Sequence, residues 1–373
     1  MRLVQGKYTT AKVFSDTAED YALAQIQMLC DNEVFKDCQV RVMSDVHPGK
    51  VGPIGFTSTL GDKIMPNVVG SDIGCGISMS IINDKHIEFR KLDTVIRNYI
   101  PTGFNIRDKV HKNFDKYCDI FSFHCPIDQD KYERSLGTLG GGNHFIEIDV
   151  DKKGRHYIAV HSGSRYLGQC ITDYYLKEGQ AYLRARGIEV PYELTWLEGE
   201  LMENYIHDVI MATRYAQINR LTILEEIEKR MKFKSIYYME CVHNTISRNP
   251  LAGEWFIRKG AIDANVGVHT IVPINMKDGI IIGYGLGNQD WNYSAPHGAG
   301  RIMNRENVKN NFTVSQFKKE MTGIYCSCIG KGTLDEAPFA YRGIDEISEA
   351  IKDTVKIDEV LKPVYNYKAG NEK

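Results

Sequence analysis

Five glycine-rich segments that carry His, Cys, Asp or Asn side chains interrupt this chain of 373 residues. They span residues 44–50, 69–76, 137–147, 161–168 and 285–301. Glycine lets the backbone adopt positive φ and approach a bound group closely, so such loops can present ligand-type side chains. The sequence therefore predicts a functional site that is built from loops. A sixth segment, 240–244, ends an expected strand with a His-Asn pair.

Short runs rich in β-branched residues lie between these loops and predict strands. We expect strands at 38–43, 77–82, 145–150, 156–161, 236–241, 254–263 and 279–284. We expect helices over 15–30, capped by Asp16 or Thr17, over 196–231, over 314–322, opened by Thr313 or Ser315, and over 343–361. Clustered strands around a long helical block, without regular βαβ alternation, indicate an α+β fold.

The charge balance limits how this chain could bind nucleic acid. Lys and Arg total 46 and Asp and Glu total 48, so the net charge is −2. This balance argues against binding through overall charge and leaves room for a local basic groove. No run reaches the roughly 18 apolar residues of a membrane helix, and the first residues lack the apolar core of a signal peptide. We therefore expect a cytoplasmic protein with no membrane partner.

Five side chains at the expected loop–strand junctions are candidate metal ligands. They are Asp72, Cys75, His144, His161 and His243. Each of them alone would more often be a structural residue. Together they offer one carboxylate, one thiolate and three imidazoles. Cys with His favours zinc, whereas a carboxylate and an open coordination position admit manganese or iron, so the residues leave the metal undecided.

His297 is a candidate nucleophile because it lies in SAPHGAGR, a glycine-rich loop that also holds Arg301. A neutral His can attack phosphorus and form a covalent intermediate, and Arg can clamp phosphate oxygens. A Cys75 thiolate paired with a His is an alternative nucleophile. The phosphate-binding pattern GxxxxGK[ST] is absent, and HSGSR is not the GxSxG nucleophile elbow.

The segments resemble, in order, those of the RtcB family of RNA ligases. The matching motifs run from Asp45 to Lys368 and are SDVHPGK, VGSDIGCG, LGTLGGGNHFIE, HSGSR, VHN, RKGA, GLGN and HGAGR. The resemblance implies one α+β domain over 1–373, with mixed or antiparallel sheets flanked by helices. It also implies joining of an RNA 3′-phosphate or 2′,3′-cyclic phosphate end to a 5′-hydroxyl end, in RNA repair or tRNA splicing.

By the same resemblance the reaction needs two Mn²⁺ ions and GTP. The metal ligands would be the five residues named above, with Cys75 bridging both ions. His297 would attack the α-phosphate of GTP and carry GMP, which then passes to the RNA 3′-phosphate before the 5′-hydroxyl displaces it. Residues matching family positions around the nucleotide are Asn143, His144, Phe145, Ile146, Glu147, His243, Asn244, Pro273, Ile274, Asn275, Met276, His297, Gly298, Ala299, Gly300 and Lys368.

The chain also departs from the family pattern. PINMK replaces the usual PGSMG, which puts Ile274, Asn275 and Lys277 where the family has small residues. Ile280 falls where a further polar nucleotide contact is usual, and Ala295 and Pro296 precede His297 in place of Cys or Ser. These changes bear on nucleotide preference and on the RNA substrate.

Two other functions stay open beside the ligase: a manganese-dependent phosphoesterase that only opens cyclic RNA ends, and a non-catalytic module that binds RNA ends. The expected partners are such RNA ends and an archease-like activator. Basic residues that could form a local phosphate groove are Arg165, Arg258, Arg301, Arg305, Lys309, Lys318 and Lys319.

Overall fold

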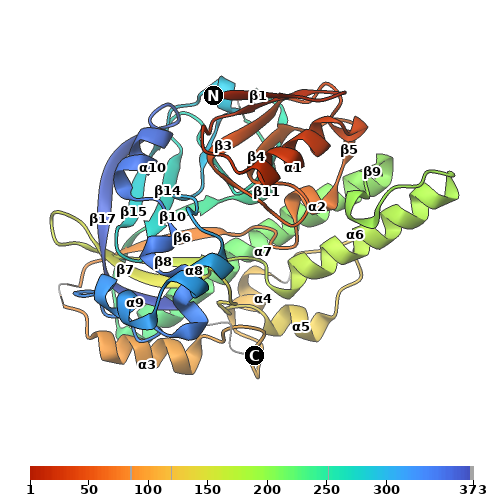
Figure 1. The fold of residues 1–373 in the computed structure, drawn as a ribbon. Helices are drawn as coiled ribbons and strands as arrows, with labels where there is room; N and C mark the ends of the chain where they lie inside the picture. The colour runs from red at the N-terminus through yellow and green to blue at the C-terminus, as the bar shows by residue number, and fades with distance from the viewer. Residues whose placement is uncertain (85, 119, 251, 370–373) are drawn as a thin grey trace.

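Two large β-sheets with helices packed on them make up the computed structural model, which describes residues 1–84, 86–118, 120–250 and 252–369 (Figure 1). The seven-stranded sheet has the order β10-β6-β8-β7-β17-β15-β14. Its strands are β10 (Ser235–Val242), β6 (Gly76–Ile82), β8 (His156–Ser162), β7 (Phe145–Val150), β17 (Val355–Lys368), β15 (Gly279–Gly285) and β14 (His269–Asn275). All neighbouring pairs in this sheet are antiparallel.

The six-stranded sheet has the order β1-β2-β3-β4-β12-β11. Its strands are β1 (Arg2–Gln5), β2 (Thr10–Val13), β3 (Val40–His47), β4 (Ile54–Thr59), β12 (Trp255–Lys259) and β11 (Asn244–Arg248). Because β2 and β3 run parallel and the other pairs antiparallel, this sheet is mixed. Two short pairs complete the described strands: β13 (Ala261–Asp263) with β16 (Ser294–Pro296), and β5 (Lys63–Ile64) with β9 (Leu197–Glu198).

The helices lie against these sheets and confirm the expected α+β class. They are α1 (Asp20–Cys30), α2 (Pro66–Val69), α3 (Phe89–Tyr99), α4 (Asn113–Tyr117), α5 (Gln129–Arg134), α6 (Tyr166–Ala185), α7 (Gly199–Met231), α8 (Arg305–Asn311), α9 (Val314–Glu320) and α10 (Ile344–Ile351). The two long helices α6 and α7 pack along each other, and α7 also contacts β6 and β8 (Figure 1). Within the described ranges, no helix is both long enough and apolar enough to cross a membrane.

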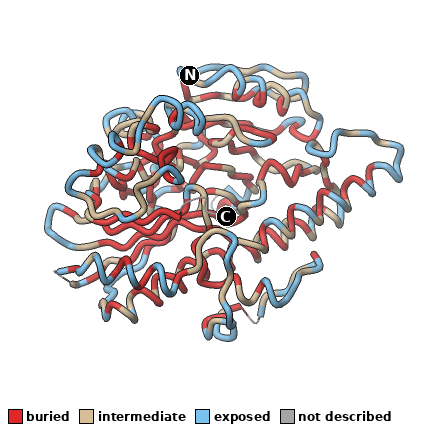
Figure 2. Tube along the Cα trace, turned by 60° about the horizontal axis from the view of Figure 1, so that its bottom comes forward, coloured by how far each residue is buried: buried red, intermediate tan, exposed pale blue. Residues whose placement is uncertain are grey.

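Alternation along the central strands divides the core into two layers. Successive strand residues point to opposite faces. Ile146 and Ile158 therefore face α3 and α7, while Phe145 and Tyr157 face the layer formed with β14, β15 and α10. Figure 2 shows the buried positions running along these strands, with exposed segments at the rim. The second face is the one that carries His161 toward the site described below.

The C-terminal region corrects the prediction of a helix over 343–361. Helix α10 ends at Ile351, and residues from Val355 onward form β17. This strand pairs with β15 on one side and β7 on the other, and those backbone hydrogen bonds outweigh the local helix preference of the sequence. Because the partners are distant in sequence, a local pattern did not indicate them.

Three smaller predictions also need correction. Helix α1 begins at Asp20 rather than near 15; Asp16 instead pairs with the N-terminal amine at 3.0 Å, and Thr17 accepts a hydrogen bond from Arg342. The strand expected over 254–263 is two strands, because Gly260 has φ +66° and turns the chain between them. The segment 161–168 leads directly into α6, a helix that the sequence analysis did not predict. In contrast, the Thr313 cap of α9 is confirmed.

Candidate functional site

Loops at one end of four neighbouring strands in the seven-stranded sheet bring the five candidate metal ligands together. Asp72 and Cys75 lie between α2 and β6, His144 directly precedes β7, His161 lies in β8, and His243 joins β10 to β11. These strands are neighbours in the order β10-β6-β8-β7. The pairing of these strands therefore brings five side chains, which are spread over positions 72 to 243 of the chain, to one place.

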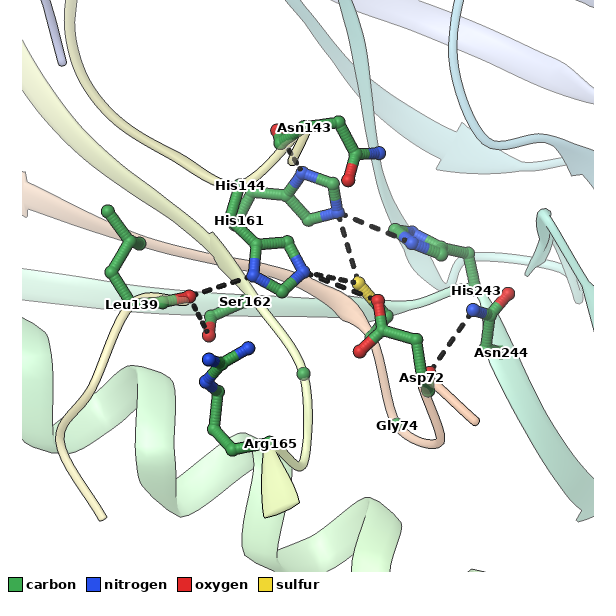
Figure 3. Close-up of polar contacts among 12 residues, drawn as sticks. Asp72, Gly74, Leu139, Asn143, His144, His161, Ser162, Arg165, His243 and Asn244 are labelled. Atoms are coloured by element: carbon green, nitrogen blue, oxygen red, sulfur yellow. Dashed lines mark hydrogen bonds and ion pairs between the residues drawn. The ribbon is translucent and has the colours of Figure 1, made fainter. Parts of the chain in front are cut away.

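Cys75 contacts two histidines of this cluster, His144 and His161, while Asp72 contacts His144 and His243 contacts His161. Figure 3 shows the three histidines and Asp72 turned toward one another. The Sγ of Cys75 lies 3.2 Å from Nε2 of His161 and 3.5 Å from Nε2 of His144. The Nε2 atoms of His161 and His243 are 3.4 Å apart, and Nε2 of His144 lies 3.3 Å from Oδ2 of Asp72. The thiol and the imidazoles are buried, whereas the Asp72 side chain is 42% exposed. The cluster is thus open on the side of Asp72.

Backbone carbonyls determine which ring nitrogen of two histidines faces the cluster. Nδ1 of His144 donates to the carbonyl oxygen of Leu139 at 2.8 Å, and Nδ1 of His161 donates to that of Asn143 at 3.2 Å. A ring that donates through Nδ1 presents a lone pair on Nε2. This arrangement is typical of metal-ligating histidines.

The electrostatics of the cluster also fit a bound cation. Burial lowers the pKa of His161 and of His243 well below the ordinary value, so these imidazoles are neutral. Burial raises the pKa of the Cys75 thiol well above its ordinary value. Burial acts to raise the pKa of Asp72 as well, but the neighbouring His144 outweighs it and holds this pKa low. The cluster thus offers neutral imidazoles, a carboxylate and a thiol, and a bound cation would deprotonate the thiol. This donor set suits a borderline divalent metal.

Neighbouring groups hold the cluster in place. Arg220 of α7 is fully buried and donates to the carbonyl oxygens of Gly74 at 2.8 Å and Ser162 at 2.6 Å, so it ties both ligand loops to the helix. The absence of a side chain at Gly163 leaves room for the Asp72 carboxylate, because a Cβ at position 163 would lie 2.0 Å from Oδ1 of Asp72. Asn244 Nδ2 donates to the Asp72 carbonyl oxygen at 3.2 Å.

His297 lies next to this cluster and is held by a buried carboxylate. Its Nδ1 is 2.7 Å from Oδ2 of Asp45, which is buried and also accepts the backbone N–H groups of His297 at 3.1 Å and Gly298 at 3.3 Å. The His297 ring is 4.9 Å from the His243 ring, centroid to centroid. Since Asp45 occupies the Nδ1 side, Nε2 remains for contact with a substrate. The side chain is 18% exposed.

One cavity of about 1060 Å³ joins the cluster, His297 and most of the predicted nucleotide contacts. Predicted site residues lining it are Asp72, Cys75, Asn143, Phe145, Glu147, His161, His243, Asn244, Pro273, Ile274, Asn275, Met276, His297, Gly298, Ala299, Gly300 and Lys368. His144 does not line the cavity and reaches the cluster from behind through its contacts with Cys75 and Asp72. Ile146 also lies apart, because it packs with α3 and α7 on the opposite face of the sheet.

The end of the cavity near Lys368 is a network of buried charges. The ammonium of Lys368 lies 2.7 Å from Oε2 of Glu336, which also accepts a hydrogen bond from the hydroxyl of Tyr341 at 2.6 Å. Burial would raise the pKa of Glu336, but Lys368 and then Arg305 outweigh it and lower this pKa to about 2. Glu147, which is hydrogen-bonded to Asn366, has its pKa raised to about 7 by burial. This wall therefore holds both cationic and acidic groups.

Several residues singled out in the sequence lie elsewhere. Lys277 points away to Glu320 of α9, at 2.6 Å, and Ile280 is buried in the core. Arg258 is buried and donates to Ser247 and Ser294, so it does not line the cavity. Of the other basic candidates, Arg301 and Arg305 line it, whereas Arg165, Lys309, Lys318 and Lys319 do not.

Sequence reasoning missed three residues of this site. Asp45 lies in the motif SDVHPGK but had no predicted role, and neither Glu336 nor Tyr341 was among the predicted site residues. Asp45 could have been proposed as a site residue because its carboxylate closely precedes His47 and Gly49 in the sequence. Glu336 and Tyr341 lie in a segment of ordinary composition, and their contact with Lys368 depends on tertiary structure alone.

Comparison with known proteins gives a consistent result over nearly the whole chain. The family model described as "tRNA-splicing ligase RtcB" matches residues 32–127 and 122–369. The RNA-splicing ligase RtcB of Escherichia coli K12 is 31% identical over 369 residues, covering 89% of this chain and 90% of that protein. The tRNA-splicing ligase RtcB of Aeropyrum pernix is 27% identical over 402 residues, covering 83% of each.

Proposed function

This chain belongs to the RtcB family, and from that premise we propose that it is an RNA ligase joining 3′-phosphate or 2′,3′-cyclic phosphate ends to 5′-hydroxyl ends. The observation that carries the proposal is the contact of the metal-type cluster with a carboxylate-held histidine in one cavity. We further propose a role in the repair of broken RNA.

The metal residues in this proposal are Asp72, Cys75, His144, His161 and His243, and the metal is a pair of Mn²⁺ ions. The lone pairs that His144 and His161 direct at Cys75, together with the half-exposed Asp72 carboxylate, support it. Bound there, the ions would neutralise phosphate charge and stabilise the charge that develops during phosphoryl transfer.

His297 is the proposed nucleophile toward GTP. Its Nε2 forms a bond to the α-phosphorus, the bond between the α- and β-phosphates breaks, and pyrophosphate leaves. The imidazole becomes positively charged in this step, and the Asp45 carboxylate beside Nδ1 stabilises that charge. An RNA 3′-phosphate oxygen then takes the guanylyl group from Nε2, and the 5′-hydroxyl oxygen attacks the 3′-phosphorus and displaces GMP.

The wall near Lys368 is the proposed guanine site. A guanine offers acceptor atoms to an ammonium and donor N–H groups to a carboxylate, which suits Lys368 and Glu147. The Lys368 ammonium is held by Glu336 and lies 5.8 Å from the Phe145 ring centre. Ile274 and Met276 add apolar surface beside it.

The phosphoesterase and the binding module are less well supported. Hydrolysis at a metal cluster does not require a histidine held by a buried carboxylate, and a binding module requires no nucleophile. The Asp45–His297 pair therefore favours the ligase.

The test is formation of a covalent adduct. Incubation with Mn²⁺ and α-labelled GTP is expected to give a labelled, acid-labile protein. His297→Ala is expected to abolish the label, while the matched control His269→Ala, outside the cavity, keeps it. An adduct that survives in His297→Ala would overturn the mechanism. Ligation of a 3′-phosphate/5′-hydroxyl nick separates the ligase from the phosphoesterase.

A further inference from the structure

The cavity extends past Asp72 along helix α6. Gln169, Thr172, Asp173 and Leu176 line this part. Their spacing of three, four and seven residues places them on one face of the helix. At 1.5 Å per residue the stripe is about 10 Å long, which is room for about three bases at the 3.4 Å spacing of a nucleic-acid strand.

Two tyrosines lie at the walls of this arm of the cavity. Tyr21 belongs to the first turn of α1, and Tyr192 begins the short 3₁₀ helix Tyr192–Leu194 that follows α6. Their residues are 64% and 47% exposed, although large aromatic side chains usually lie mostly buried. The backbone near Tyr192 is anchored, because Asn67 Nδ2 donates to the Glu193 carbonyl oxygen at 2.9 Å. Helix α2, which carries Asn67, packs on α6 (Figure 1).

The charges in this arm are mixed. Lys50 and Lys259 line it together with Glu19, Asp173 and Glu193. A channel that bound only phosphates would need a surplus of cations. Carboxylates and an amide beside exposed aromatic rings instead suit nucleobases, whose faces stack on tyrosine and whose amino groups donate to carboxylates.

We propose that this arm, bounded by Tyr21, Tyr192 and the α6 face Gln169–Leu176, binds the bases of a single-stranded RNA end, with both tyrosines as stacking platforms. The inference rests on the proposed function, since RNA is the occupant that the reaction at the neighbouring cluster requires. It assigns substrate recognition to residues outside the motifs of the nucleotide site.

The test is RNA binding without GTP, which separates this inference from the chemistry. The affinities of short dye-labelled single-stranded RNAs, one with a 3′-phosphate and one with a 5′-hydroxyl end, are measured by fluorescence anisotropy. Tyr21→Ala and Tyr192→Ala are each expected to weaken binding of at least one RNA by about 5- to 100-fold, the range for a lost stacking contact. Tyr21→Phe and Tyr192→Phe keep the ring and are expected to bind as the wild type does.

Tyr237→Ala is the matched control, because Tyr237 is also 47% exposed and does not line the cavity. Unchanged RNA affinity in both alanine variants, or equal losses in the phenylalanine variants, would overturn the stacking role. The GMP adduct is measured on the same preparations and is expected to form normally in every tyrosine variant. Absence of that adduct in the wild-type protein would contradict the proposed function. The RNA affinities of the tyrosine variants would then still test whether this arm binds RNA bases.

Discussion

At the scale of single residues, Asp45 is the group whose contribution to the site is most sharply defined by geometry. Its Oδ2 lies 2.7 Å from Nδ1 of His297 and accepts the backbone N–H groups of His297 and Gly298. It therefore fixes both the ring and the loop that carries it. Its own burial keeps this contact away from water.

Asp45→Asn tests that role. We expect the GMP adduct to form about 100-fold more slowly or worse, because an amide can donate to Nδ1 and favours the wrong tautomer for attack through Nε2. Since Asp45 acts through His297, the KM for GTP and the melting temperature should stay near wild type. Single-turnover labelling over a range of pH should show an altered profile. Wild-type rates at every pH would remove Asp45 from the mechanism.

Residue chemistry was also what the sequence predicted best. Cys75, His161 and His243 could be proposed as ligands only as members of a set with Asp72 and His144. The structure brings these residues together, and their binding of a metal stays a prediction. Glu336 and Tyr341 could not be found in this way. Carboxylates and tyrosines are common, and only the approach of Lys368 makes these two part of the site.

At the scale of elements, the packing of the loop before β6 against the loop after β8 depends on the absence of a side chain at Gly163. Gly163 follows β8 directly, and a Cβ there would meet Oδ1 of Asp72 at 2.0 Å. Real Cβ atoms do not approach an oxygen that closely, so any larger residue must displace the carboxylate.

Gly163→Ala should therefore weaken Mn²⁺ binding by displacing Asp72, and should lower adduct formation in proportion. Isothermal titration with Mn²⁺ measures the affinity. Gly332→Ala is the control, because a Cβ there meets nothing within 4 Å. Equal Mn²⁺ affinity in both variants would show that Asp72 tolerates the displacement or does not bind the metal.

Element prediction succeeded where the local pattern and the tertiary partners agree. The runs 145–150 and 156–161 became β7 and β8, with their ends within one residue of prediction. Prediction failed at residues 355–361, which were expected to be helical and form the first half of β17, because strands distant in sequence hold them extended. It also missed α6, because glycine-rich HSGSR was interpreted as a loop that continued through 168.

At the scale of the whole molecule, Arg220 connects the long helix α7 to the sheet and to both ligand loops. It is fully buried, bonded to three backbone or side-chain oxygens and paired with Glu240. Few side chains contact so many separate parts of the chain.

Arg220→Met should destabilise the protein by about 3–5 kcal/mol, since removing one partner of a buried ion pair leaves the other uncompensated. Urea unfolding measures the free energy. Arg214→Met on the same helix, which lines a different cavity, is the control and should cost much less. A small effect of Arg220→Met would mean that water replaces the guanidinium.

The position of β17 within its sheet has a consequence for how the protein is made. This strand comes last among the described strands of the chain, yet it lies between β7 and β15 in the middle of the sheet. While the ribosome is still translating residues 355–368, both neighbours lack their partner and present open edges, which are prone to pair with other chains. The two strand edges therefore stay open until residues 355–368 have been made, and the pairing of β17 then closes both of them together.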